Sequence, residues 1–592
     1  MTAARITLVA AAIAVAVFAA PQKRAARPSA SPKASDALVR TWMRSLTLRE
    51  KVAQLVVVPF YGKLTNSESD LYRKYYGLAH ELKVGGMLLI NRSEPYALAA
   101  FLNRMQRAAT LPLLVAGDFE RAISMRVESD TLFPHNMAFA ATRNPEFSRF
   151  QGAVTARQGR ALGVPWIFAP VADVNNNPDN PIINIRSYSE NPEEVAEHVR
   201  AYIAGAHSFK DAAGNPVLVT VKHFPGHGDT ATDSHMALPV ITVGRERLNE
   251  VELVPFRAAI AAGVDAVMTA HIAVPAIDPD KLPSTLSAAV LGGLLKREMA
   301  FDGLVVTDAL EMQGVAKQWP SGEAAVRALE AGADVLLMPP DPEAAVSAVV
   351  AAVQSGRITR ERLDASVEKF LAAKVQVGVH RKRTVDIEAL TDALDKPEDL
   401  ARVQEIADAS VTLVKNENDA LPLRDAAQAC FLVLTESRGS QAGRAFAAEV
   451  RKRAPSAALA VLDPQATEAD LNAAAEKAKG CSVIAVAAFA SVTAYRGSVA
   501  LAGGYPKLME ALLASGRPVA LIALGNPYLV RSFPSVSAYM TTYSTVAPSE
   551  IAAAKALFGD IPINGRLPVT IPGIAKYGDG IQLPKLDAKD AR

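Results

Sequence analysis

The densest cluster of chemically active side chains lies in one segment of fifteen residues, VKHFPGHGDTATDSH, which runs from Val221 to His235. Its ionisable members are Lys222, His223, His227, Asp229, Asp233 and His235. Two glycines and a proline indicate that the segment is a loop rather than a helix or a strand. Side chains of these types can transfer protons, bind metal ions or hold polar ligands. The segment is therefore our first candidate for a functional site.

Asp233 and His235 are two positions apart, and residues with this spacing point the same way in an extended loop. The carboxylate can then bond one imidazole nitrogen and favour the protonated ring, while the other nitrogen faces a substrate. A histidine held in this way can donate a proton to a leaving oxygen and later accept one from water. This interpretation predicts a general acid/base pair.

Three other interpretations of the loop remain open at this point. His223, His227 and Asp229 have the chemistry of metal ligands, with His235 as a fourth, but their spacing matches no zinc pattern. The string GHGDTA fits a loose dinucleotide-binding fingerprint, although the two threonines and the proline after it disfavour the helix that such a loop must open. In the third interpretation, the histidines only bond the backbone of the loop.

A second candidate site is Asp308, which follows an apolar run in FDGLVVTDALEM. A carboxylate beside a bound sugar can attack the anomeric carbon and form a covalent glycosyl-enzyme, which leads to net retention of configuration. An aspartate directly after a strand also caps helices well, so a helix N-cap is the alternative role.

These side chains need a scaffold that brings them together, and residues 51–339 have a suitable pattern. Short apolar runs alternate there with stretches of helical periodicity, which is typical of repeated β-α units and a parallel sheet. The eight runs are LVVVPF, GGMLLI, LPLLVAGD, WIFAPVADV, VLVTVKHF, DAVMTAH, LVVTDA and DVLLMP. Eight parallel strands close a barrel. The predicted fold class is α/β, with a (β/α)8 TIM-like barrel followed by an α/β/α sandwich.

Five of the eight runs end in ionisable residues: Asp118, Asp173, Lys222 with His223, His271 and Asp308. The carboxyl ends of the strands form the rim where active sites develop in such barrels. Ionisable groups that converge on one mouth favour an enzyme over a purely structural protein. We predict His271, in MTAHIAVPAID, as a rim residue without an assigned role.

The 592 residues are too many for one core, so we predict several domains. The barrel is expected over 36–380, a linker over 381–399 and the sandwich over 400–592, where CFLVLTE, CSVIAVAAFA and PVALIALG alternate with Ala-rich helical stretches. Cys430 and Cys481 begin two of these runs. They fit either buried small side chains or a disulfide in an exported chain, and their spacing is not that of a metal site.

The amino terminus predicts export. Arg5 precedes fifteen uncharged residues, 6–20, and a stretch rich in Pro, Ser, Ala and Lys follows over 21–35. We predict a signal peptide over 1–20, a tether over 21–35 and a periplasmic or secreted protein; an uncleaved membrane anchor is the alternative. Apart from this segment no stable membrane insertion is expected. The formal net charge of +2, without a basic stripe, argues against nucleic acid as a partner.

At the level of motifs, the chain resembles glycoside hydrolase family 3, and its β-N-acetylglucosaminidase branch in particular. The acid/base loop of that branch reads Lys-His-Phe-Pro-Gly-His-Gly, Asp-Thr, two variable residues and Asp-Ser-His, and every fixed position matches from Lys222 to His235. The β-glucosidases of the family lack this loop and take an acid/base Glu from the second domain. The resemblance extends through APVADVNNNPDNPIINIRSYSENP, VVTDALEM, VTLVKN, LPL, LGNPY and GRLPVTIP.

This resemblance implies that Asp308 is the nucleophile and that Asp233 and His235 form the acid/base pair. It also implies a set of contacts to the hydroxyl groups of the sugar, which charged side chains bind through strong, directional hydrogen bonds. These contacts are Asp118, Arg186, Lys222 and His223. No metal or organic cofactor is implied.

One segment departs from the pattern of the family. The family usually has Asp-x-Glu-Gly-Gly after the third strand, whereas GDFERAISMRV keeps Asp118 and Glu120 and replaces both glycines. We therefore expect a different backbone there.

The predicted activity is that of a retaining exo-β-N-acetylglucosaminidase, acting on peptidoglycan fragments or chitin-type oligosaccharides. Hydrolysis of β-glucosides is one alternative, and phosphorolysis is another, because a histidine acid/base repels phosphate less than a carboxylate does. More distant alternatives are a metal-dependent hydrolase that uses His223, His227 and Asp229, and a catalytically inactive sugar-binding protein. The sequence predicts no oligomeric state.

Overall fold

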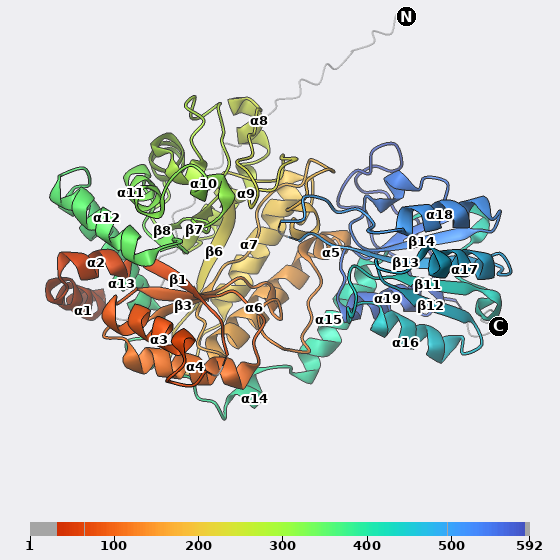
Figure 1. The fold of residues 1–592 in the computed structure, drawn as a ribbon, viewed down its shortest axis with the longest axis horizontal. Coiled ribbons are helices and arrows are strands. Elements are labelled where there is room, and N and C mark those ends of the chain that lie inside the picture. Colours follow the sequence, from red (N-terminus) through yellow and green to blue (C-terminus); the bar gives the residue numbers. More distant parts are fainter. Residues whose placement is uncertain (1–31, 64, 494, 587–592) are drawn as a thin grey trace, which may run out of the picture.

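The structure, a computed structural model, describes residues 32–63, 65–493 and 495–586, which form two lobes (Figure 1). The first lobe contains a parallel sheet of eight strands in the order β8-β7-β6-β5-β3-β2-β1-β9. A parallel bridge between Val306 and Val335 joins the two ends of this order and closes a barrel. The predicted (β/α)8 class is therefore confirmed.

Each of the eight apolar runs contains one strand of the barrel. The strands are β1 (Val56–Phe60), β2 (Gly86–Leu89), β3 (Leu114–Gly117), β5 (Trp166–Ile167), β6 (Leu218–Phe224), β7 (Ala266–Thr269), β8 (Leu304–Val306) and β9 (Leu336–Leu337). Their side chains are almost all buried, because side chains fill the inside of the barrel and helices cover its outside. A further short strand, β4 (Glu120–Ile123), lies outside the barrel.

Helices form the outer layer of the first lobe (Figure 1). They include α1 (Pro32–Ser45), α2 (Leu48–Gln54), α3 (Asp70–Tyr76), α4 (Pro95–Ala108), α5 (Asn136–Ala141), α6 (Pro145–Ala161), α7 (Pro192–Ser208), α8 (Arg245–Glu250), α9 (Val254–Ala261), α10 (Gln313–Ala316), α11 (Ser321–Ala331), α12 (Pro342–Gln354) and α13 (Arg360–Gln376). In α4, α6, α7 and α12, an Asp, Asn or Glu cap precedes a proline in the first turn. This pairing starts a helix sharply, because the cap accepts a free N–H and the proline lacks one.

The second lobe is an α/β/α sandwich around six strands in the order β10-β15-β14-β13-β11-β12. The strands are β10 (Thr412–Asn416), β11 (Cys430–Leu434), β12 (Ala458–Leu462), β13 (Ile484–Ala490), β14 (Val519–Gly525) and β15 (Ala538–Thr541). Only the β10–β15 pair is antiparallel. One face packs against α16 (Arg444–Arg453) and α19 (Ala547–Leu557), and the other against α17 (Glu468–Ala478) and α18 (Tyr505–Ala514).

Cys430 and Cys481 form a disulfide, with 5.8 Å between their Cα atoms. Cys430 begins β11, and Cys481 precedes β13, which pairs with β11. Of the two alternatives drawn from the sequence, the cross-linked form is the one in the structure.

One apolar cluster includes residues of both lobes. Met137 and Ala141 of α5 belong to the same buried cluster as Leu529 and Tyr543 of the sandwich. Hydrogen bonds reinforce the contact, since both carboxylate oxygens of Glu190 accept bonds of 2.6 Å from the N–H and hydroxyl of Thr570. The lobes are therefore packed together rather than only tethered.

Helices α14 (Leu390–Ala393) and α15 (Pro397–Ser410) lie between the lobes in the sequence. The predicted start of the second domain at residue 400 falls inside α15, which contacts both α5 and α19. The predicted signal peptide and residues 21–31 of the tether lie outside the described residues, and α1 occupies the last four positions of the tether. Among the described residues, no helix combines the length and the apolar character needed to cross a bilayer.

Candidate active site

A cavity of about 420 Å³ opens at the carboxyl ends of the barrel strands, where such barrels place their active sites. Its volume suits a sugar-sized ligand. Six of the residues that the sequence predicts for the site line the cavity: Asp118, Arg186, Lys222, His223, His235 and Asp308. Lys222 and His223 lie at the end of β6, and the others lie in segments that follow β3, β5, β6 and β8, so the fold brings together residues that are far apart in the sequence.

The loop after β6 depends on its glycines. Gly226 has a φ of 123°, which is strained for any residue with a side chain. At Gly228 an added Cβ would lie 1.7 Å from the carbonyl oxygen of Val174, so only glycine allows this approach. The buried carboxylate of Asp173 accepts hydrogen bonds from the backbone N–H groups of His223, at 3.2 Å, and His227, at 2.8 Å. These contacts fix the loop against the end of β5.

One wall of the cavity is a network of paired charges. Arg186 donates to both carboxylate oxygens of Glu120, at 2.9 and 2.7 Å. Lys222 Nζ lies 2.8 Å from Asp118 Oδ1 and 2.9 Å from Glu120 Oε1, and Arg126 donates to Asp118 at 3.1 Å. Since each charge is held by a partner of opposite sign, the wall is preorganised for a ligand with hydroxyl groups.

The cations keep both carboxylates of this wall ionised. Burial raises the pKa of Asp118, but Lys222 and Arg126 lower it more, to about 2. Burial likewise raises the pKa of Glu120, and Arg186 and Lys222 bring it well below its usual range. At neutral pH the two side chains are therefore pure hydrogen-bond acceptors.

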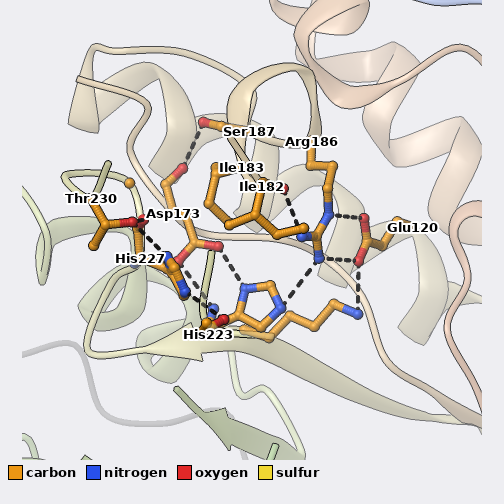
Figure 2. Close-up of polar contacts among 12 residues, drawn as sticks. Glu120, Asp173, Ile182, Ile183, Arg186, Ser187, His223, His227 and Thr230 are labelled. Carbon is orange, nitrogen blue, oxygen red and sulfur yellow. Dashed lines mark hydrogen bonds and ion pairs between the residues drawn. The ribbon is translucent and has the colours of Figure 1, made fainter. Parts of the chain in front are cut away.

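His223 lies between Asp173 and Arg186 (Figure 2). Its Nδ1 is 2.7 Å from Asp173 Oδ2, and its Nε2 is 3.3 Å from Arg186 Nη2. Because a guanidinium can only donate, Nε2 accepts, and we assign the ring hydrogen to Nδ1. Asp173 thus orients His223. The sequence places Asp173 at a strand end but does not indicate that it orients His223.

Asp233 and His235 form the hydrogen bond that their spacing predicts. His235 Nδ1 lies 2.8 Å from Asp233 Oδ1, which also accepts the backbone N–H of His235 at 2.9 Å. Asp233 Oδ2 accepts the backbone N–H of Tyr495 from the second lobe. Asp233 is buried, whereas the side chain of His235 is 23% exposed and lines the cavity. Nδ1 is thereby committed to Asp233, and Nε2 is left for a ligand.

The charge state of Asp233 follows from these contacts. Burial raises the pKa of its carboxyl, but the hydrogen bonds from His235 and the N–H of Tyr495 lower it below the usual value. Asp233 is therefore an anion beside the imidazole, and it can stabilise a positive charge on that ring.

Asp308 lies two residues beyond β8 and is partly exposed to the cavity. Its Oδ1 accepts the N–H of Ala309 at 2.8 Å, and its own N–H donates to Thr269 Oγ1 at 3.2 Å. Burial raises the pKa of Asp308, but His271, His223 and the Ala309 N–H together lower it below its usual value. The alternative role as a helix N-cap is wrong, because α10 begins only at Gln313.

His271 follows the carboxyl end of β7, but its side chain does not line the cavity. The side chain is fully buried, and both ring nitrogens have partners at 2.8 Å: Thr285 Oγ1 for Nδ1 and the Ala309 carbonyl for Nε2. A ring with both nitrogens paired inside the protein can be buried at little cost. His271 therefore supports the segment that carries Asp308.

The three metal-ligand candidates are not brought into one cluster. His227 is buried, and its ring bonds the hydroxyls of Ser234, at 2.9 Å, and Thr230, at 3.1 Å. Burial lowers the pKa of His227 to about 4, so the ring is neutral and holds the loop. Across the part of the chain that the structure describes, no three His, Cys, Asp or Glu side chains are grouped as a metal site.

Ala122, which replaces the second glycine of the family motif, has a φ of 53°. This left-handed conformation is the one that a glycine adopts easily. We expected a different backbone here, yet Ala122 takes the conformation that favours glycine, and Glu120 still reaches Arg186.

The chain matches the family model described as the glycosyl hydrolase family 3 N terminal domain over residues 47–373, and that of the C-terminal domain over residues 411–590. A β-N-acetylglucosaminidase/β-glucosidase from Cellulomonas fimi is 34% identical over 396 residues, which are 65% of this chain and 68% of the relative. A β-hexosaminidase A from Pseudoalteromonas piscicida is 30% identical over 548 residues, which are 82% of this chain and 89% of the relative.

Among solved structures, a glycoside hydrolase family 3 β-N-acetylglucosaminidase from Paenibacillus sp. str. FPU-7 is 35% identical, with a TM-score of 0.77. The alignment covers 89% of this chain and 99% of that structure. Both lobes are therefore similar to that protein.

Proposed function

This chain belongs to glycosyl hydrolase family 3 and is a glycoside hydrolase, and we propose that it releases terminal β-linked N-acetylglucosamine with retention of configuration. The observation that carries the proposal is the arrangement of His235. Its Nδ1 bonds the buried Asp233, its Nε2 is free for the cavity, and Asp308 lines the same cavity. The names of the similar proteins, N-acetylglucosaminidase and hexosaminidase, support the choice of sugar.

In the first step that we propose, the ionised carboxylate of Asp308 attacks the anomeric carbon. His235, as an imidazolium, donates its Nε2 proton to the glycosidic oxygen, so the bond from carbon to oxygen breaks and the leaving group departs as an alcohol. The product is an ester between Asp308 and the sugar. Asp233 holds the Nδ1 hydrogen throughout and stabilises the cation.

In the second step, the neutral Nε2 of His235 accepts a proton from water. The water oxygen attacks the anomeric carbon and breaks the ester, which restores the carboxylate of Asp308 and the imidazolium of His235. Two successive inversions at one carbon give net retention.

The charged wall supplies the binding part of the proposal. The carboxylates of Asp118 and Glu120 can accept hydrogen bonds from sugar hydroxyls, while Lys222 and Arg186 can donate them. His223 Nε2 already accepts from Arg186, so His223 helps to orient that guanidinium in the wall. Such groups fix the orientation of a terminal sugar above Asp308.

A parallel assay on the 4-nitrophenyl β-glycosides of N-acetylglucosamine and glucose tests the sugar, because the two substrates differ only at the 2-position. We expect a strong preference for N-acetylglucosamine in kcat/KM, and a preference for glucose would overturn the choice of branch. NMR can identify the anomer that is released first, which tests retention. We expect the β-anomer.

Phosphorolysis by the same site is a second candidate reaction. It is favoured by one observation, the use of a histidine next to the cavity, because a neutral imidazole does not repel phosphate as a second carboxylate would. Product analysis with and without inorganic phosphate separates the two reactions. Formation of a glycosyl phosphate would move the proposal from hydrolysis to phosphorolysis.

We also propose that the enzyme is exported and acts on peptidoglycan fragments or chitin-type oligosaccharides. The composition of residues 1–35 supports export, as does the disulfide, since disulfides persist mainly in oxidising compartments. Mass spectrometry of the protein from cell fractions tests this idea. Cleavage near residue 20 is expected, and a full-length chain in the cytoplasm would contradict export.

A further inference from the structure

Tyr495 brings an aromatic ring from the second lobe to the mouth of the cavity. The residue is 59% exposed and lines the cavity, and its ring centroid is 5.1 Å from that of His235. The two rings meet edge to face, with an interplanar angle of 64°. Single exposed aromatic residues are common on protein surfaces. This one differs in its place, next to the proposed acid/base residue, and in how its backbone is held.

The loop that carries Tyr495 follows β13 and is fixed from two sides. Glu436, just after β11, accepts hydrogen bonds from the N–H and hydroxyl of Ser491, both at 2.8 Å, and from Arg496 at 3.0 Å. On the other side, the N–H of Tyr495 donates to Asp233 at 2.9 Å. The backbone beneath the exposed ring is thus positioned before a ligand arrives, which reduces the entropy lost on binding.

The place of Tyr495 relative to the bond that is cleaved follows from its neighbour. In the proposed function, His235 gives a proton to the glycosidic oxygen, and that oxygen leaves with the leaving group. The space beside His235 is therefore where the first residue of the leaving group must lie. Tyr495 contacts His235 and has no hydrogen bond to the charged wall that faces the terminal sugar.

The chemistry of this corner suits a saccharide. A pyranose ring has an apolar face of C–H groups, and a tyrosine ring offers it a large, rigid surface at low entropic cost. Glu311 also lines the cavity and is an exposed residue. Burial raises the pKa of the Tyr495 hydroxyl, and the charge of Glu311 raises it further. A carboxylate there can accept bonds from sugar hydroxyls.

We propose that Tyr495 is the binding platform for the saccharide leaving group, so that the second lobe sets the preference for what is attached to the released sugar. This inference rests on the proposed function. The side chain of Tyr495 would bind the leaving group, whereas its backbone N–H bonds Asp233. Substitution of the side chain therefore removes the first contact and keeps the second.

The test compares two substrates of the full-length enzyme that differ in the leaving group. One is N,N′-diacetylchitobiose, whose leaving group is a sugar. The other is the β-fluoride of N-acetylglucosamine, whose leaving group is a fluoride ion. The measured quantity is the ratio of the two kcat/KM values. We expect Tyr495→Ala to lower the kcat/KM of the disaccharide about tenfold relative to that of the fluoride. This is the effect of losing one ring contact of about 1.4 kcal/mol.

Two controls accompany this variant. Tyr495→Phe keeps the ring and should hold the ratio within about twofold, since only the hydroxyl is lost. Tyr96→Ala removes a tyrosine ring that is also exposed, at 43%, but does not line the cavity, and it should leave the ratio unchanged. Thermal unfolding of each variant confirms that it is folded.

Equal losses on both substrates in Tyr495→Ala would overturn the proposal, because they would indicate that the ring only supports the acid/base pair. An unchanged ratio would overturn it as well. If the unaltered enzyme cleaved neither substrate, the proposed function itself would fail, and the assignment of Tyr495 would fall with it.

Discussion

The backbone N–H of Tyr495 donates a hydrogen bond of 2.9 Å to Oδ2 of Asp233, across a separation of 262 residues. The other oxygen of this carboxylate accepts two bonds from His235. Asp233 is thus held from both lobes, and its carboxylate cannot turn without breaking one of these bonds. In the docked protein, groups from both lobes therefore position the proposed acid/base pair.

Replacement of Asp308 by Asn should abolish turnover of every substrate, with a loss of roughly 10⁴-fold or more in kcat, because the proposed nucleophile is removed. The fold should survive, since Asn keeps an acceptor for the Ala309 N–H. Mass spectrometry of the unaltered enzyme after reaction with a slow fluorinated N-acetylglucosamine analogue checks the assignment. A label on another residue would contradict it.

Replacement of His235 by Ala should cause a loss that depends on the leaving group. A sugar alkoxide needs a proton in order to leave, whereas a nitrophenolate does not. We expect a loss of about 10² to 10⁴-fold on a natural disaccharide and a distinctly smaller loss in the first step with an activated aryl glycoside. Pre-steady-state bursts isolate that step. Equal losses in the burst phase would contradict the role of general acid.

Replacement of Asp233 by Ala should give the same pattern in a milder form. The change removes the anion that orients Nδ1 of His235 but leaves the imidazole in place. The ratio of disaccharide to aryl glycoside turnover is again the measurement. A larger loss than in the His235 variant would show that Asp233 does more than position the ring.

Replacement of Lys222 by Met should change how stability depends on pH. In the folded chain, Asp118 has a pKa of about 2 and Glu120 a lowered one, against roughly 4 when unfolded. Their contribution is thus complete above about pH 4 and is lost as the pH falls through the folded values. Lys222 lowers both pKa values, so its removal should destabilise the protein most near pH 6.

Urea unfolding of this variant between pH 3 and 6 is the measurement. The difference from the unaltered enzyme should shrink as the pH falls toward the folded pKa of Asp118. Lys74→Met, at an exposed lysine of α3, is the matched control. A difference that stays constant over this pH range would indicate that Lys222 acts only through packing.

Replacement of both Cys430 and Cys481 by Ala should lower the free energy of unfolding of the sandwich. The disulfide closes a loop across a sequence separation of 51 residues, for which the chain-entropy treatment gives about 4 kcal/mol. Guanidinium unfolding with and without a reductant checks this, with the double variant as the control that the reductant should not affect. Activity at 25 °C should persist, because neither cysteine lines the cavity.

What was predictable from the sequence is local. Most barrel strands are apolar on both faces, and the bond between Asp233 and His235 joins residues only two apart. The family motif adds Arg186, which reaches the cavity from the segment after β5. Periodicity, spacing and a long motif are all readable along the chain.

The rest depends on contacts between distant segments. Nothing in SVTAYRG marks Tyr495, because its bond to Asp233 exists only once the lobes have docked. His271 stands at a strand end like the residues of the site, but Thr285 and the Ala309 carbonyl offer it partners inside the protein. Likewise, the role of Asp173 in orienting His223 can be recognised only once the position of His223 is known.

The shared cluster has a consequence for the covalent link between the lobes. Met137 belongs to an apolar cluster on one face of the sandwich, and Glu190 bonds Thr570, so contacts outside the connecting segment also hold the halves together. Fusion into a single gene product fixes the ratio of the halves at one to one and raises their effective concentration.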